Sequence, residues 1–428
     1  MKPSGIEWIG DIPDDWEVRR LKGLGEQTIG LTYSPQDITD NSGTLVLRSS
    51  NIQNGKLVLD RDDNVYVSID VENKILKDED ILICSRNGSR NLVGKTAFVI
   101  TYGKKLSYGA FTTIFRSKYN KFLFYVFNAG VFEYHLASYN TSTINQLTTS
   151  MLNEIRVPFP PVKTQQKIAD YLDEKCGEID ATIAKQKESI EKLKAYKQSL
   201  ISETVTKGLD KSAPLKPSGI EWIGDIPDDW EVTKISRLYS IQLGKMLQPE
   251  KKSSGDTYEP YICAANLSSG TFRLDEVKYM WISEPEKDIY RLKRDDLLVT
   301  EGGDVGISSI WKDDISPCYF QNALHRVVPK KGNSNRFLHY WLIVLKSVGY
   351  IDLICNKSTI AHFTKEKFAQ SLILSIPLQT QEKIADYLDS KCSQIDKYIT
   401  EKQNIIQKLD AYKKSLIFEC ITGKHKIY

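Results

Sequence analysis

The sequence predicts an α+β fold built twice: two strand-rich mixed α/β domains joined by two long helices that pack as an antiparallel coiled coil. The prediction is based on three repeated strings. KPSGIEWIGDIPDDWEV occurs without a mismatch at 2–18 and 216–232, TQQKIADYLDEKCGEID at 164–180 returns as TQEKIADYLDSKCSQID at 380–396, and AYKQSLI at 195–201 returns as AYKKSLI at 411–417. A period this long exceeds that of any solenoid unit and predicts a duplicated module with internal pseudo-twofold symmetry.

Each module opens with a segment punctuated by Gly and Pro, around Trp8, Pro13 and Trp16 and again around Trp222, Pro227 and Trp230. Because proline and glycine interrupt helices, we expect a docking segment with buried tryptophans rather than a long helix.

The middles of the modules diverge strongly, yet both carry short β-prone runs. These runs are 44–47, 81–84, 96–100 and 112–115 in the first copy, and 258–263, 296–300 and 308–311 in the second. A helix expected at 121–136 matches one at 336–353, and STINQLT (142–148) mirrors STIAHFT (358–364). Shared ends should do the same job twice, whereas unlike middles should recognise two different things. Neutral drift after duplication is the alternative.

Near the end of each module, mainly apolar residues recur at alternating intervals of four and three positions, which is the pattern of a coiled-coil seam. The seam comprises Leu172, Cys176, Ile179, Ile183, Gln186, Ile190, Leu193, Lys197 and Leu200, then Leu388, Cys392, Ile395, Ile399, Lys402, Ile406, Leu409, Lys413 and Leu416. We expect antiparallel packing, because the first helix must lead into a domain that the second then leaves. A helix over 164–205 would be roughly 60 Å long and could act as a ruler. Gln186 and Lys402 could fix the register or lie at a solvent edge.

The composition narrows the class of protein. The N-terminus lacks an apolar signal core and the longest apolar stretches are too short to span a bilayer, so we expect a cytoplasmic protein without a membrane partner. Seven scattered cysteines without a CxxC pair should be reduced, and five histidines without ligand spacing predict no metal site. GSRNLVGKT (88–96) has one residue too many for a phosphate-binding loop, so no cofactor site is expected, and nothing nominates a catalytic residue.

The charge distribution points to nucleic acid more clearly than the net charge of +3 does. Residues 85–132 contain no Asp or Glu, and neither do residues 315–351 at the matching place in the second copy. Two acid-free basic tracts favour phosphate contact over an ordinary solvated surface. The candidate phosphate contacts are Arg86, Arg90, Lys95, Lys104, Lys105, Arg116 and Lys118, then Arg326, Lys330 and Lys331.

Polar loops that follow the strands carry side chains suited to reading base edges: Arg for guanine, Asn or Gln for adenine, Glu or Asp for cytosine. The candidates are Ser85, Arg86, Asn87, Arg90 and Asn91 in the first module, and Glu301, Asp304, Gln321, Asn322 and His325 in the second. Ordinary polar surface loops are the alternative.

Together these elements resemble the specificity subunit of Type I restriction-modification systems over essentially the whole chain. The resemblance is carried by GIEWIGDIPDDWEV before each variable domain, by DILICSRNG and DLLVTEGGDVG within them, and by PFPPVKTQQKIADYLD and IPLQTQEKIADYLD before the paired helices. The first module departs from the pattern, with GSRNLVG in place of the compact GGDVG.

The resemblance implies target recognition domains at 1–160 and 211–376, with helical regions at 161–210 and 377–428. Each domain would read one half of a split double-stranded DNA sequence, while the helices would set the spacer and bind two modification (methyltransferase) subunits. Catalysis would belong to those partners, using S-adenosylmethionine, and to restriction subunits using ATP with Mg²⁺. A coiled-coil scaffold without sequence-specific DNA reading is the alternative from another class.

Overall fold

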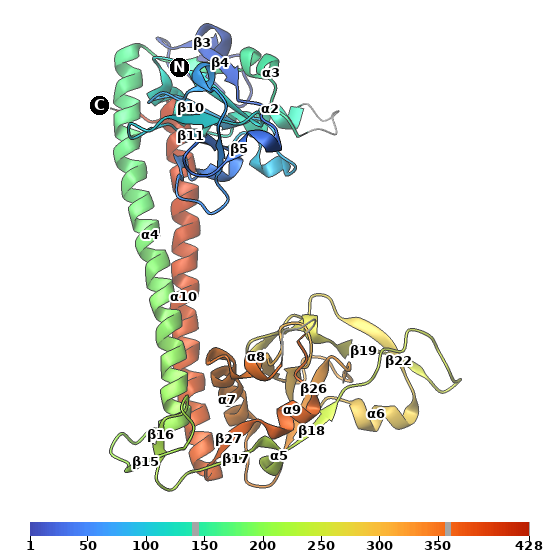
Figure 1. Cartoon of the computed structure of the whole chain (residues 1–428). Coiled ribbons are helices and arrows are strands. Elements are labelled where there is room, and N and C mark those ends of the chain that lie inside the picture. Colours follow the sequence, from blue (N-terminus) through green and yellow to red (C-terminus); the bar gives the residue numbers. More distant parts are fainter. Residues whose placement is uncertain (139–144, 356–360, 428) are drawn as a thin grey trace. The chain divides into compact units, whose positions relative to one another are not determined.

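The computed structural model describes residues 1–138, 145–355 and 361–427 (Figure 1), so the first residues of the two ST motifs, 142–144 and 358–360, lie outside the described residues. The chain forms two compact units. Unit 1 consists of Met1–Gln186 with Gln403–Tyr428, and unit 2 of Lys187–Lys402. Each unit therefore combines one strand-rich domain with parts of both long helices, and neither coincides with one sequence module.

Unit 1 contains two four-stranded sheets. The first has the order β11 (Thr96–Phe98), β10 (Ile81–Cys84), β13 (Thr112–Arg116) and β4 (Glu26–Ile29), and the second β12 (Leu106–Tyr108), β6 (Thr44–Leu47), β9 (Val65–Val67) and β5 (Ile38–Thr39). Shorter pairs are β1 (Lys2–Pro3) with β2 (Asp11–Ile12), β3 (Glu17–Arg20) with β14 (Arg156–Phe159), and β7 (Ile52–Gln53) with β8 (Lys56–Leu57). The helices are α1 (Asn120–Phe127), α2 (Val131–Ser138), α3 (Thr149–Glu154), the first part of α4 (Val162–Lys207) and the last part of α10 (Leu378–Ile421).

Unit 2 repeats this plan. Its first sheet is β24 (Ser308–Ile310), β23 (Leu297–Thr300), β26 (Leu324–Pro329) and β18 (Tyr239–Leu243), and its second is β25 (Tyr319–Phe320), β19 (Thr257–Ile262) and β22 (Lys278–Ile282). The shorter pairs are β15 (Leu215–Pro217) with β16 (Asp225–Pro227), β17 (Glu231–Lys234) with β27 (Leu372–Ser375), and β20 (Leu267–Ser268) with β21 (Thr271–Phe272). The helices are α5 (Ile235–Leu238), α6 (Glu284–Tyr290), α7 (Asn335–Ser347), α8 (Tyr350–Ile354), α9 (Lys365–Gln370), the first part of α10 and the last part of α4.

Strand β10 shows why the apolar runs of the middles form central strands. Ile81 and Ile83 face the core that contains helix α1, whereas Leu82 and Cys84 face the core against the second sheet. Side chains alternate between the two faces of a strand, so a strand that is buried on both faces needs apolar residues throughout. Leu297, Leu298 and Val299 of β23 divide between two cores in the same way.

Backbone details also repeat between the units. Glu79 and Asp295 both adopt a positive φ, of 67° and 69°, just before the central strand. The side chain of Asn120 donates to the carbonyls of Glu79 and Phe115. That of Asn335 donates to Asp295 and Val327. The common architecture therefore extends through the divergent regions.

The expected helices at 121–136 and 336–353 are each broken in two. The breaks contain Gly130, with φ of 82°, and Gly349, with φ of 74°. Glycine adopts a positive φ at little cost, which lets a helix end and the chain turn into the next helix.

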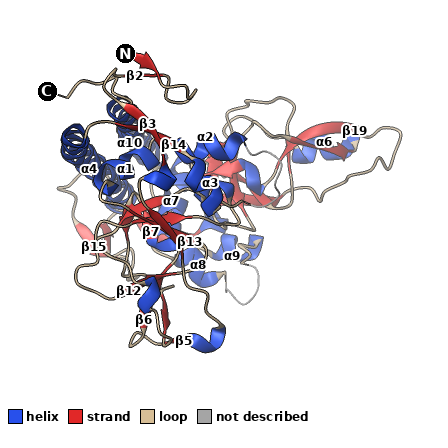
Figure 2. Cartoon of the chain, turned by 90° about the horizontal axis from the view of Figure 1, so that it is seen from above, coloured by secondary structure: helices blue, strands red, loops and turns tan. Residues whose placement is uncertain are grey.

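The long helices pack antiparallel, as predicted. In unit 1, Lys413 of α10 donates to Asp180 of α4 at 2.7 Å, and in unit 2, Lys197 of α4 donates to Asp396 of α10. The start of each helix therefore lies beside the end of the other, and Figures 1 and 2 show α4 and α10 side by side. The seam residues Leu172, Ile179, Ile183, Ile190, Leu388, Ile395 and Leu416 are buried, and Leu193, Leu200, Ile399, Ile406 and Leu409 are half-buried, as are Gln186 and Lys402.

The repeated opening block caps the end of the long helix from the other module. In unit 1, Trp16 is buried and packs near Gly423, just after α10, while Lys424 donates to the Ile9 carbonyl. In unit 2, Trp230 packs near Gly208, just after α4. The expected burial is confirmed for Trp16 and Trp230, whereas Trp8 and Trp222 are half-buried.

Candidate nucleic-acid interface

Three turns of unit 1 meet at one end of its first sheet. Strand β10 ends at Cys84, and the backbone N–H groups of Ser85 and Arg86 both donate to the Phe111 carbonyl at 3.0 Å. Phe111 directly precedes β13. The turn after β4 joins them, because the N–H of Ala110 donates to the carbonyl of Leu31. We call residues 85–91, 109–111 and Gln146, which pairs with Arg86, the first loop edge.

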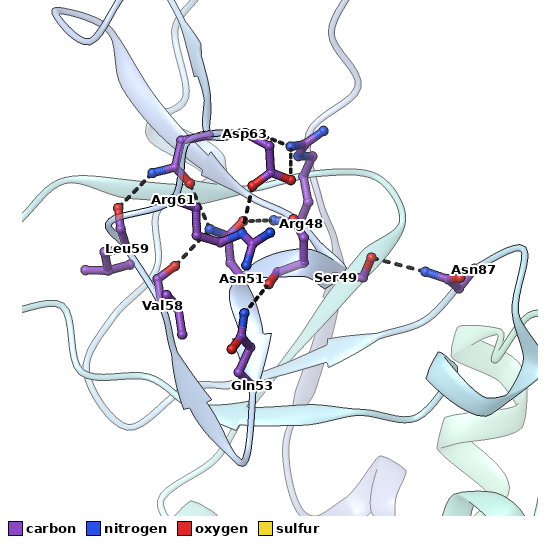
Figure 3. Close-up of polar contacts among 11 residues, drawn as sticks. Arg48, Ser49, Asn51, Gln53, Val58, Leu59, Arg61, Asp63 and Asn87 are labelled. Carbon is purple, nitrogen blue, oxygen red and sulfur yellow. Dashed lines mark hydrogen bonds and ion pairs between the residues drawn. The ribbon is translucent and has the colours of Figure 1, made fainter. Parts of the chain in front are cut away.

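Polar and aromatic side chains project from the first loop edge. The Arg86 guanidinium lies over the Phe111 ring, 5.4 Å from its centroid, and Phe111 is 61% exposed. Asn87 donates to the Ser49 hydroxyl at 3.1 Å, which ties this edge to the segment that precedes the β7–β8 hairpin (Figure 3). Arg90 and Asn91 are exposed. The sequence-predicted cluster from Ser85 to Asn91 is therefore on one surface, although the Ser85 side chain itself is buried and donates to Phe111.

A buried asparagine holds the segment to which Asn87 is tied. Asn51 accepts from the Arg48 N–H and donates to the Val58 carbonyl, both at 2.9 Å, and Arg48 also pairs with Asp63 (Figure 3). Because Asn51 uses its donor and acceptor within the fold, it supports the surface and does not project from it.

Unit 2 forms the corresponding surface, which we call the second loop edge: residues 301–305, 321–323 and His362. The N–H of Glu301 donates to the Ala323 carbonyl at 2.9 Å, and Gly302 pairs with His362. The structure thus brings Glu301 to the same end of the sheet as Gln321 and Asn322. Burial raises the pKa of Glu301, and the charge of His362 partly offsets that rise.

The two edges share one backbone frame. Backbone contacts show that four positions of the first loop edge have equivalents in the second. Ser85 corresponds to Glu301, Arg86 to Gly302, Phe111 to Ala323, and Gln146 to His362. The frame continues into the ST motifs, because Thr148 and Thr364 each cap the following helix through the side chain. The same frame therefore presents different side chains in the two units.

The strand register divides each basic tract between opposite ends of the sheet. Strand β13 begins beside Cys84 and ends with Arg116 beside Glu26, so Arg116 and the following Lys118 lie at the end away from the first loop edge. The turn with Lys104 and Lys105 follows β11 at that far end as well. In unit 2, β26 begins beside Thr300, so Lys330 and Lys331, which follow it, are likewise at the far end. The basic residues of one tract therefore do not all lie at one end of the sheet.

Several predicted contacts are used within the fold. Arg116 binds the buried Asp80 through two hydrogen bonds of 2.6 and 2.7 Å, which raises the pKa of Arg116. His325 is fully buried, with Nε2 2.8 Å from the Phe363 carbonyl, and its pKa is lowered by burial. It therefore cannot reach a base, which corrects that prediction.

Basic side chains of the second tract likewise bind groups within the fold. The Arg326 side chain is 11% exposed, lies 3.8 Å from Asp296 and donates to the Arg291 carbonyl. Lys330 donates to the Ser236 carbonyl at 2.6 Å, and Asp304 at the second loop edge pairs with Lys346. Lys331, Lys104, Lys105 and Lys118 are exposed, Lys95 is half-buried, and all five stay candidate phosphate contacts.

Sequence reasoning missed three residues at the edges, Phe111, Gln146 and His362, and also Ser49, to which Asn87 of the first loop edge donates. Phe111 could have been noticed as a large apolar residue after Gly109 and Ala110 inside an acid-free tract. Gln146 and His362 occupy the same place in the two ST motifs, which was a usable signal. Ser49 had no local signal, because only the fold brings it to Asn87.

Two features are absent from the described ranges 1–138, 145–355 and 361–427. No three His, Cys, Asp or Glu side chains group there in a way that could hold a metal ion. Within the same ranges, none of the helices combines the length and apolarity that crossing a membrane requires.

These features define a duplicated α+β protein with two polar loop edges on equivalent frames. Comparison with known families agrees: the model of the Type I restriction modification DNA specificity domain matches residues 13–194 and again 227–411. These two matches cover most of the chain. The chain belongs to this family and is a specificity subunit of the Type I restriction-modification class.

Curated relatives and solved structures extend the similarity over the full length. The putative type I restriction enzyme MjaX specificity subunit of Methanocaldococcus jannaschii is 24% identical, over 98% of this chain and 96% of its own. The StySPI specificity subunit of Salmonella potsdam is 20% identical, over 97% and 90%. The HsdS subunit of Thermoanaerobacter tengcongensis shares the fold with a TM-score of 0.52 at 15% identity, covering 99% of this chain and 100% of its own.

A structure described for complex assembly and conformational transition of the type I R-M system has a TM-score of 0.71 at 16% identity. It covers 97% of this chain and 100% of that one. At this identity the likeness establishes the shared fold.

Proposed function

We propose that each unit reads one half of a bipartite, asymmetric double-stranded DNA target through its loop edge. The main support is that the two loop edges have the same backbone arrangement but different side chains. Arg86 and Phe111 in unit 1 occupy the positions of Gly302 and Ala323 in unit 2. A shared frame would dock on DNA in the same way twice, because phosphate contacts position a protein without reading sequence. Unlike side chains at the edges would then select different bases.

The long helices fit a second task, which is to set the spacer and dock two methyltransferase subunits. The ion pairs Asp180–Lys413 and Lys197–Asp396 repeat one arrangement, so each unit offers an equivalent helical surface. Two equivalent surfaces suit two copies of one partner. Several relatives carry the name specificity subunit of a type I restriction enzyme, which supports partners of this kind.

Catalysis in this proposal belongs to the partners. Methyltransferase subunits would use S-adenosylmethionine, and restriction subunits would use ATP with Mg²⁺, while this chain would supply sequence reading and assembly. The scaffold alternative lacks support, because the family model describes a DNA specificity domain over both modules.

The deciding experiment exchanges residues 21–155 for the equivalent segment of a relative and maps methylated bases in the genome. These boundaries keep the β3–β14 pair intact, since β3 ends at Arg20 and β14 begins at Arg156. We expect one half of the methylated sequence to change and the other to stay. The matched exchange of 235–371, inside the β17–β27 pair, should change only the other half. If both halves changed in a folded complex, or if methylation kept no sequence preference, the proposal would be wrong.

A further inference from the structure

We infer that Arg86, held by the ring of Phe111, reads a guanine in the half-site bound by unit 1. This inference rests on the proposed function, and it names one side-chain pair and one base that only the first unit can recognise in this way.

The position of Arg86 is fixed on two sides. The backbone N–H of Arg86 donates to the Phe111 carbonyl at 3.0 Å, and Arg86 forms an isolated antiparallel β-bridge with Gln146. The neighbouring Ser85 N–H donates to the same carbonyl, and Ser85 is buried. The side chain of Arg86 therefore begins from a rigid point at the end of a central strand, which is where a base-reading group is best placed.

The guanidinium of Arg86 is both exposed and oriented. It lies 5.4 Å from the centroid of the Phe111 ring, a distance typical of a cation–π contact. Within the described part of the chain, no carboxylate forms an ion pair with Arg86. The contact with the ring uses none of the guanidinium N–H donors in a hydrogen bond, so these donors remain available to a ligand.

The donor set selects the base. A planar guanidinium can donate two parallel hydrogen bonds to O6 and N7 of guanine in the major groove, and the other three bases offer no such pair of acceptors there. The exposed face of Phe111 is apolar and could pack against the neighbouring base or its methyl group. The guanidinium of Arg116, by contrast, donates two hydrogen bonds to the Asp80 carboxylate and is not available to bind a base.

Unit 2 lacks the pair at the equivalent place. Gly302 stands for Arg86 and Ala323 for Phe111, so neither the cation nor the ring is present. The inferred guanine contact should accordingly belong to one half of the target only.

The test measures base preference at every target position with the complete complex of the full-length chain and its methyltransferase subunits. A randomised double-stranded DNA library and genome-wide methylation both serve as readouts. For Arg86→Ala we expect the preference for guanine to fall about 5- to 150-fold at one position of one half-site. Phe111→Leu should weaken the same position by a smaller factor, because the arginine stays but loses its platform.

The matched control is Arg19→Ala, which removes another arginine that lies over a phenylalanine ring, Phe159, at 4.4 Å on the β3–β14 pair. It should leave every position unchanged. Weakening of all sequences by Arg86→Ala with a shallower salt dependence would show a phosphate contact and overturn the inference, as would a change in the other half-site. If the unaltered complex had no two-part preference, the proposed function would fail instead.

Discussion

Removing the arginine of the Arg116–Asp80 pair should destabilise the first sheet of unit 1. Asp80 is 1% exposed, and Arg116 donates to both of its carboxylate oxygens and to the Ile75 carbonyl. Among the described residues, Arg116→Leu would leave the buried carboxylate of Asp80 with only the backbone N–H of Lys77 as a hydrogen-bond partner. Breaking a fully buried pair costs about 3–5 kcal/mol. Because the Arg116 side chain is 38% exposed, we expect about 2–3 kcal/mol instead.

Hydrogen exchange of β10 and β13 peptides measures this loss locally. A cost of about 2–3 kcal/mol corresponds to roughly 30- to 150-fold faster exchange where opening of the sheet limits the rate. The double variant Asp80→Asn with Arg116→Leu should recover more than half of the protection, since no buried charge remains. Lys118→Leu, an exposed change nearby, should stay within about 0.5 kcal/mol. Unchanged exchange in Arg116→Leu, or a double variant as unstable as the single one, would refute the reasoning.

Three further outcomes are expected. Burial lowers the pKa of His339 in helix α7 to about 4, so the unfolded chain binds a proton at a higher pH than the folded chain does. The free energy of unfolding of unit 2 should therefore drop by up to about 1.4 kcal/mol per pH unit as the pH falls from about 6.5 to 4. His339→Phe should reduce this pH dependence, measured by urea titrations at several pH values. Seven residues added after Ile190, matched by seven after Lys402, should lengthen both helices by about 10 Å and keep the seam in phase. The spacer of the methylated sequence should then grow by a few base pairs while the half-sites stay the same. An unchanged spacer in an active complex would contradict the hypothesis that the helices set the spacer length. Lys413→Asp should loosen the helix pair in unit 1, and adding Asp180→Lys should restore about 0.5–1 kcal/mol of stability, measured as the coupling energy of a double-mutant cycle; a coupling of zero would mean that this ion pair contributes nothing.

The sequence alone was sufficient for features that depend on local pattern. The seam from Leu172 to Leu200 follows from steps of three and four along one helix, and the buried run from Ile81 to Cys84 from its apolar composition. The exact repeats revealed the duplicated architecture and the docked tryptophans. Residues within a few positions of one another carry each of these signals, so no knowledge of the distant chain was needed.

The tertiary structure decided which polar residues remain available to a ligand. Arg86 and Arg116 looked alike in an acid-free tract, yet one lies exposed on Phe111 and the other is bound to Asp80, which is 36 residues away. His325 looked like a loop donor and is buried against Phe363. A side chain's partners come from strands paired across the sheet, and the sequence around each residue does not specify that register.

The tertiary structure also decided how the modules are divided. The repeats suggested two consecutive modules, whereas each compact unit takes one strand-rich domain, the start of one long helix and the end of the other. The reason is physical: the apolar seam of each helix needs a partner, and antiparallel packing brings the end of α10 to the start of α4 in unit 1. The repeats predict that two seams exist, but only the folded chain shows which halves of them share a core.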